Sequence, residues 1–157
     1  MTSPLTKTMV TASSILPWRF VKKTRKNLSK LAIAVAFHDL GIWTNQTCDY
    51  LEPSQQLAHD YLVKYGQEDW CDEIAAMIGL HHKIRPYKAK PNWLVEPFRK
   101  ADWTDVSQGM LKFGLASSTV AEILAHFPNA GFHKRLLALS KQRLQTHPFK
   151  PLPMLRF

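Results

Sequence analysis

Hydrophobic residues recur along most of the chain at the spacing of α-helices, and no segment sustains the alternation of apolar and polar residues that is typical of a half-buried strand. Helices are expected at about residues 27–39, 53–66, 68–83 and 132–146. Two more are expected between them, one with Pro97 in its first turn that ends near residue 107 and one that ends before Pro128. The pattern therefore predicts an all-α fold, a single helical domain of about five to six helices.

Residues that begin and end helices support these ranges. Asn27 or Ser29 is suited to cap the first helix, and Gly41 follows its end. Thr119 and Glu122 have the spacing of a T-x-x-E capping box. From residue 31 to residue 37 the first helix is apolar on every side, which predicts a place in the middle of the domain.

The first 26 residues lack this helical pattern and are rich in positive charge. Residues 1–30 contain seven Lys or Arg and no acid, whereas the other 127 residues contain 14 basic and 12 acidic side chains. The net charge of +9 therefore belongs mainly to the N-terminal segment. We divide the chain into a basic irregular segment, 1–26, and a helical domain, 27–157. A solvated tail is the simplest interpretation of the segment. Attraction to nucleic acid or acidic membranes is a less favoured alternative, and an organelle transit peptide is another.

Length, hydropathy and cysteine content exclude several classes of protein. The chain of 157 residues fits one domain with a buried core. The longest apolar run is seven residues, and a membrane-spanning helix needs about 20. Cys48 and Cys71 cannot form a disulfide framework. These features predict a cytoplasmic protein with reduced thiols and no membrane span.

Candidate chemistry begins with the His38–Asp39 pair at the end of the apolar helix. A buried carboxylate is costly unless it is paired or bound to a cation, so this pair is either a surface helix end or part of a site. His81 continues the apolar stripe of its own helix, while His82 lies at the edge of that stripe. The residues of the stripe are Trp70, Ile74, Met77 and Ile78.

Further polar positions on two other helices extend the candidate set. Asp102 and Asp105 lie three residues apart on one helix, so at least one of the two carboxylates should face inward. His59 and Asp60 flank an apolar stripe on opposite sides, and spacing does not choose between them. Histidine and aspartate side chains that converge in a helical core suit one or two divalent transition metal ions such as Mn, Fe, Co, Ni or Zn.

The order of these residues resembles the HD-domain superfamily of metal-dependent phosphohydrolases. The resemblance covers about residues 31–157 and rests on four elements in sequence: Phe37-His38-Asp39-Leu40-Gly41, His59, His81-His82 and Ala101-Asp102. It implies an all-α HD-type domain that hydrolyses a small, nucleotide-like phosphoester through metal-bound water.

The resemblance also implies roles for individual residues. His38, Asp39 and Asp102 match the core metal ligands, and His38 and Asp39 would serve catalysis. His59 and His81 match the additional ligands of two-metal members, with His82 as the alternative to His81. Asp39 would bridge two ions, and Asp105 has no assigned place. Lys83 and Arg85 follow the histidine pair, where cations either bind a substrate phosphate or simply keep the loop soluble.

One departure from the family bears on function. HD domains usually supply a histidine from a helix before the His-Asp pair, but residues 1–37 contain no His, Cys, Asp or Glu. Either water takes that position, or the site is impaired, or the N-terminus does not represent the natural first helix. In the last case apolar surface would be exposed. The alternatives to a phosphohydrolase are a degenerate, non-catalytic HD-like binding module and an HD-type di-iron oxygenase similar to myo-inositol oxygenase.

Overall fold

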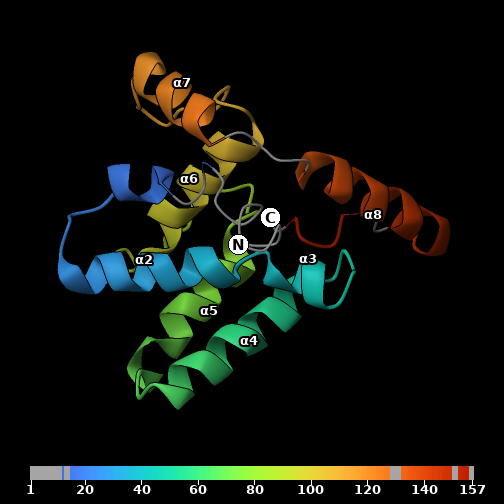
Figure 1. The fold of residues 1–157 in the computed structure, drawn as a ribbon, viewed down its shortest axis with the longest axis horizontal. Helices are drawn as coiled ribbons and strands as arrows, with labels where there is room; N and C mark the ends of the chain where they lie inside the picture. The colour runs from blue at the N-terminus through green and yellow to red at the C-terminus, as the bar shows by residue number, and fades with distance from the viewer. Residues whose placement is uncertain (1–11, 13–14, 128–131, 150–151, 156–157) are drawn as a thin grey trace, which may run out of the picture.

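The computed structural model describes residue 12 and the ranges 15–127, 132–149 and 152–155, and within them it confirms the all-α prediction (Figure 1). Six of the α-helices are ten residues or longer, and the described residues form no β-strand. The elements in chain order are η2 (Leu16–Arg19), α2 (Arg25–Phe37), α3 (Leu40–Thr44), α4 (Leu51–Lys64), η3 (Glu68–Trp70), α5 (Cys71–Leu80), α6 (Val95–Val106), α7 (Ser117–His126) and α8 (Phe132–Thr146).

Two of the predicted helix caps are wrong. Thr24 caps α2, because its hydroxyl accepts a hydrogen bond of 3.2 Å from the Asn27 amide, so the helix begins before either predicted cap. Helix α7 begins at Ser117 after Ala116, whose backbone is extended and whose side chain cannot cap. Thr119 therefore lies inside the first turn of α7. It has the composition of a capping box but not the position.

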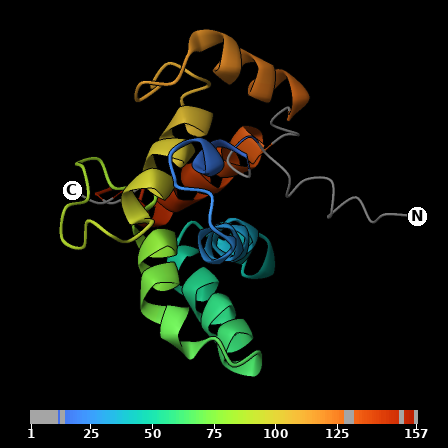
Figure 2. The ribbon, with the colours of Figure 1, turned by 90° about the vertical axis from the view of Figure 1, so that its left-hand side faces the viewer.

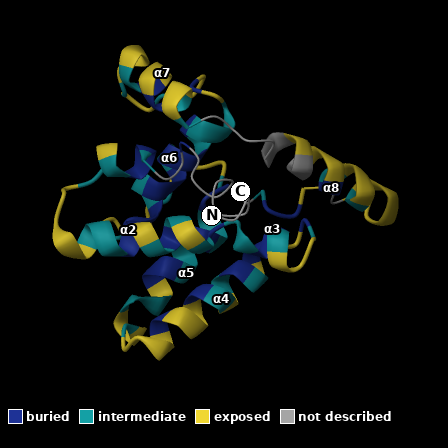
Figure 3. Cartoon of the chain, viewed as in Figure 1, coloured by how far each residue is buried: buried dark blue, intermediate teal, exposed yellow. Residues whose placement is uncertain are grey.

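Helix α2 lies between α4 and α5 on one side and η2 and α6 on the other (Figures 1 and 2). Its buried residues join a core shared by four helices, which consists of Leu31, Ala34, Ala58, Leu62, Ile74, Met77, Ile78, Leu94, Val95 and Phe98. Burial does not extend around the whole helix, because Ala32 and Ala36 are exposed one turn apart (Figure 3). The expectation of a completely buried helix is therefore only partly met.

A buried ion pair fixes α2 against α5. The Lys30 ammonium pairs with the Glu73 carboxylate, and both residues are less than a tenth exposed. The other oxygen of Glu73 accepts a hydrogen bond of 2.8 Å from the Leu94 amide at the start of α6. One carboxylate thus connects three helices of the core.

The N-terminal segment is not wholly a solvated tail. Leu16 and Pro17 are buried in η2, and Leu16 shares a cluster with Ala12, Ala101 and Ile123. Residues 22–26 are exposed, as the tail interpretation expects, whereas Pro4 and most of the first 14 residues lie outside the described part. A short apolar element therefore anchors the basic segment on α6.

Within the described ranges, none of the helices is both long enough and apolar enough to cross a membrane. Cys48 and Cys71 are both free thiols, as predicted.

Candidate metal centre

The His38–Asp39 pair lies at a sharp break between two helices. His38 still has helical backbone angles at the end of α2, while Asp39 leaves the helical region with φ −111° and ψ 5° before α3 begins. The break is held from α4, because the Ser54 hydroxyl accepts a hydrogen bond of 2.9 Å from the Gly41 amide. An added Cβ on Gly41 would stand only 2.5 Å from the Tyr50 carbonyl oxygen, so this close approach requires glycine.

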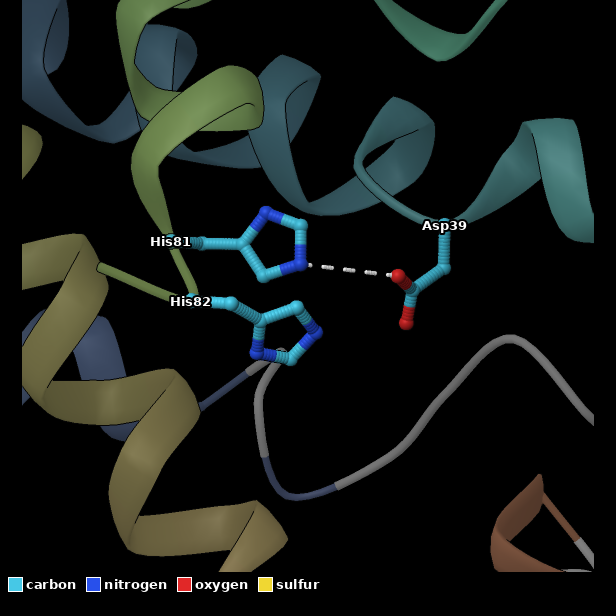
Figure 4. Close-up of side chains that lie close together, drawn as sticks. All are labelled: Asp39, His81 and His82. Atoms are coloured by element: carbon cyan, nitrogen blue, oxygen red, sulfur yellow. Dashed lines mark ion pairs between the residues drawn. The ribbon is translucent and has the colours of Figure 1, made fainter. Parts of the chain in front are cut away.

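Three candidate ligands converge where α5 ends opposite this break. Figure 4 shows His81 and His82 side by side, facing Asp39. One ligand atom from each of the three lies within 4.8 Å of the other two, and His81 Nε2 is 3.7 Å from Asp39 Oδ1. His81 is fully buried, His82 is 5% exposed, and the Asp39 side chain is the most open at 18%. This difference in exposure makes the Asp39 side the more accessible side of the group.

His38 joins the group through Asp39. Its Nε2 lies 3.1 Å from Asp39 Oδ2, so the two carboxylate oxygens of Asp39 face two different imidazoles. The His38 and His81 rings meet edge to face, with centroids 5.3 Å apart. Asp39 is therefore the residue that connects His38 to His81.

Backbone carbonyls fix the orientation of both imidazoles. His38 Nδ1 lies 2.8 Å from the Val35 carbonyl oxygen, and His81 Nδ1 lies 2.7 Å from that of Ile78. A carbonyl oxygen only accepts, so each Nδ1 must carry hydrogen and donate it. Each Nε2 is thereby aimed at Asp39. A hydrogen bond from the second ring nitrogen is also how metal-binding histidines are usually held.

Two buried carboxylate oxygens have no hydrogen-bond partner among the described residues, Asp39 Oδ1 and Asp102 Oδ2. Asp102 Oδ2 is 3.1 Å from His82 Nδ1, close enough for an ion pair but without a hydrogen bond. A buried charged oxygen without a partner carries a large desolvation cost, which a cation would offset. These two oxygens without a hydrogen bond are the atoms that a metal ion would find available as ligands.

Burial and neighbouring charges shift the pKa values of His38 and His81 in opposite directions. Burial alone would lower the pKa of His38, but the Asp39 carboxylate and, more weakly, Asp102 outweigh burial and raise it to about 9. Burial and neighbouring His82 lower the pKa of His81 to about 4. Burial alone would raise the pKa of Asp39 and of Asp102, yet His38 lowers the first and His82 lowers the second. Both carboxylates are therefore ionised at neutral pH.

The remaining predicted residues occupy different positions. Asp102 is buried on α6 and reaches the group through His82. His59 is exposed on α4, and the structure does not bring it to the cluster. Lys83 is half-buried, and its carbonyl oxygen accepts hydrogen bonds of 3.1 Å from Arg99 and Trp103. Arg85 is exposed on the same loop, while Asp105 is half-buried on α6.

Sequence reasoning missed Tyr50. It is fully buried, and its hydroxyl lies 2.9 Å from His82 Nε2 and 3.5 Å from His81 Nε2. The pattern started the second helix at Pro53, which left Tyr50 in a loop without predictable neighbours. The helix in fact begins at Leu51, directly after it.

Comparisons with protein-family models, with curated proteins and with solved structures find no match for this chain. The case for a metal centre therefore rests on the geometry of its own donors.

Proposed function

We propose that the chain is a metal-dependent phosphohydrolase that hydrolyses a small, nucleotide-like phosphoester. The observation that carries the proposal is the convergence of Asp39, His81 and His82, whose ligand atoms lie within 4.8 Å of one another. His38 faces the second oxygen of Asp39. The reaction class is the one implied by the resemblance of these residues to HD domains.

The donors fit a divalent transition metal. Two nitrogen or oxygen ligands held at about 2.0–2.2 Å by one ion stand about 2.8–3.6 Å from each other. The contact between His38 and Asp39 measures 3.1 Å, within this range, and that between His81 and Asp39 measures 3.7 Å, just beyond it. Imidazole and carboxylate together suit Mn, Fe, Co, Ni or Zn. Both the spacing and the chemistry of the donors support the assignment.

Asp39, His81 and His82 would hold the metal, with His38 at the second oxygen of Asp39 and Asp102 beside His82. Because the two Asp39 oxygens face different histidines, Asp39 is also the residue suited to bridge two ions. When bound, a divalent ion lowers the pKa of water and polarises a phosphoryl oxygen, which is the chemistry that phosphoester hydrolysis needs.

The chain's own residues would orient and admit the substrate. The Val35 and Ile78 carbonyls keep the imidazoles aimed inward, and burial excludes bulk water from all sides except that of Asp39. A substrate phosphate would therefore approach from the Asp39 side. Lys83 and Arg85, on the loop after the histidine pair, would supply positive charge for it.

The direct test measures metal content and turnover on the same samples. The purified protein is incubated with Mn, Fe, Co, Ni or Zn, desalted and analysed for metal, and then assayed with p-nitrophenyl phosphate and bis(p-nitrophenyl) phosphate. We expect bound metal and metal-dependent turnover in wild type, and a sharp loss of both in His38→Ala. His126→Ala is the matched control, because His126 is exposed on α7. Equal metal in wild type and His38→Ala, or none in either, would refute the site.

A non-catalytic metal-binding module is the second candidate, and the burial of the group favours it. His38, His81, His82 and Asp102 are each 6% exposed or less, which leaves little open surface for a substrate. This candidate predicts the same metal content and the same loss in His38→Ala, but no turnover of either phosphoester with any of the five metals.

A further inference from the structure

Tyr50 brings a phenol oxygen to the interior of the candidate metal centre. The residue lies immediately before α4, and its ring packs with Ile42, Leu51 and Leu139 in a second apolar cluster. Its side chain is fully buried. Packing therefore fixes where the hydroxyl points, which is toward the Nε2 atoms of His81 and His82.

Several polar atoms of the candidate ligands surround the Tyr50 hydroxyl. His81 donates its Nδ1 hydrogen to Ile78, so its Nε2 faces Tyr50 and Asp39 with a lone pair. Asp39 Oδ1, an acceptor, has no partner among the described residues. The single hydroxyl hydrogen of Tyr50 can serve one acceptor, and His82 Nε2 at 2.9 Å is nearer than His81 Nε2 at 3.5 Å.

Polar atoms of Tyr50, His81 and Asp39 thus converge on one place, with at most the hydroxyl proton of Tyr50 between them. Such an arrangement is unfavourable in a dry interior and becomes favourable when a cation occupies it. The distances from the Tyr50 oxygen to the two imidazole nitrogens, 2.9 and 3.5 Å, lie within the spacing of about 2.8–3.6 Å expected for neighbouring ligands of one ion.

We infer that Tyr50 is a ligand of the metal centre and binds the ion through its phenolate oxygen, beside His81 and Asp39. The inference rests on the proposed metal centre but not on the phosphohydrolase reaction. On binding, the O–H bond of Tyr50 breaks, its proton passes to solvent and an oxygen–metal bond forms. No oxidant or reductant is required.

This assignment supplies the anchor that residues 1–37 do not. That stretch contains no His, Cys, Asp or Glu. Tyr50 offers an oxygen at the start of α4. A centre completed in this way keeps its metal through desalting, whereas a centre short of one ligand would not.

The test uses ferric ion as the probe, because phenolate bound to ferric iron gives a charge-transfer band in the visible that histidine and carboxylate ligands do not give. The protein is loaded with iron under air, desalted, and examined for iron content and visible absorption. We expect the band in wild type and in Tyr65→Phe, and its absence in Tyr50→Phe. Tyr65 is the matched control because it is 58% exposed and lies at the other end of the same helix.

Competition with a chelator gives a second readout. Tyr50→Phe should weaken Zn or Co binding at least about tenfold, the lower end of what the loss of a group that supports a metal site costs. Circular dichroism and thermal melting check that the variant folds, since the ring is kept and only an oxygen is lost. Resonance Raman of the iron-loaded wild type, excited in the band, should enhance tyrosine ring modes and needs no variant.

Each outcome decides a different claim. Iron bound by wild type without a visible band, or a band that persists in Tyr50→Phe, overturns the assignment of Tyr50 and leaves the metal centre intact. Affinity lost in Tyr50→Phe without a band in wild type means that Tyr50 only positions His82, which also overturns it. Wild type that binds no metal overturns the metal centre itself.

Discussion

Replacing Gly41 by alanine tests how the break between α2 and α3 positions the site. The added Cβ would stand 2.5 Å from the Tyr50 carbonyl oxygen, 3.0 Å from the Ser54 hydroxyl oxygen and 3.2 Å from Pro53 Cβ. The first contact is with backbone, which no rotamer change can relieve. The N-terminus of α4 must therefore shift, or the break must open.

The magnitude follows from the cost of overpacking. Forcing a methyl group into a packed interior costs about 1–3 kcal/mol. For a chain of this length, 1 kcal/mol lowers the melting temperature by about 2–4 °C, so Gly41→Ala should melt about 2–12 °C below wild type. Because Asp39 and Tyr50 lie on the two sides of the clash, metal affinity should fall as well.

Gly79→Ala is the matched control. Its added Cβ would meet Gln55 Nε2 at 2.6 Å, but that atom is the free end of a flexible side chain. The gain of about 1 kcal/mol from alanine in a helix is offset by loss of the hydrogen bond from Gln55 to the Ala75 carbonyl, also about 1 kcal/mol. Thermal and urea unfolding, followed by circular dichroism, compare the three proteins. A Gly41→Ala variant as stable as Gly79→Ala would refute the close approach of α3 to α4.

Three further predictions follow from packing and charge. Leu16→Ala should lower the free energy of unfolding by about 2–5 kcal/mol, measured by thermal unfolding, because Leu16 is fully buried against α6. An unchanged melting temperature would mean that residues 15–20 do not pack on the domain. Glu73→Gln should cost about 3–5 kcal/mol in urea unfolding by leaving the Lys30 ammonium buried without a carboxylate, and a loss below 1 kcal/mol would contradict that. His38, with a pKa raised to about 9 in the metal-free protein, must lose its proton to bind metal. Release of the His38 proton alone should therefore raise the apparent metal affinity from chelator competition about tenfold per pH unit below that value, and release of the Tyr50 proton as well would make the rise steeper. A flat profile between about pH 6 and 8 would exclude His38 as a ligand.

The helical framework was predictable because long amphipathic stretches carry their own signal. The last helix, residues 132–146, has the predicted bounds, and the apolar stripe of α5 correctly placed His81 in the interior. Short elements carry little periodicity. The four residues of η2 pack on α6 because of partners more than eighty positions away, which no local pattern reveals.

The candidate site was predictable in part. Helical spacing placed His81 on an inward face, and a buried His38 was one of two possibilities at the end of the apolar helix. The contact of His82 with Asp102 depends on how α5 and α6 cross. His59 shows the converse: its order in the chain suggested a ligand, while its position on α4 leaves it in solvent. Arg99 is buried because it pairs with Glu96 one turn earlier on α6 and donates to the Lys83 carbonyl, and only the second partner depends on the folded chain.

Each aligned imidazole of the centre receives its orientation from a carbonyl three residues earlier in its own chain segment, Val35 for His38 and Ile78 for His81. The orientation of each imidazole is thus set locally, as soon as the end of its helix forms. What remains for the tertiary structure is to bring two prealigned helix ends together. An ion bound between them would cross-link the C-terminal ends of α2 and α5, in addition to the Lys30–Glu73 ion pair farther along the same interface. Removal of the ion would then loosen the contact between the helices and leave the helices themselves formed.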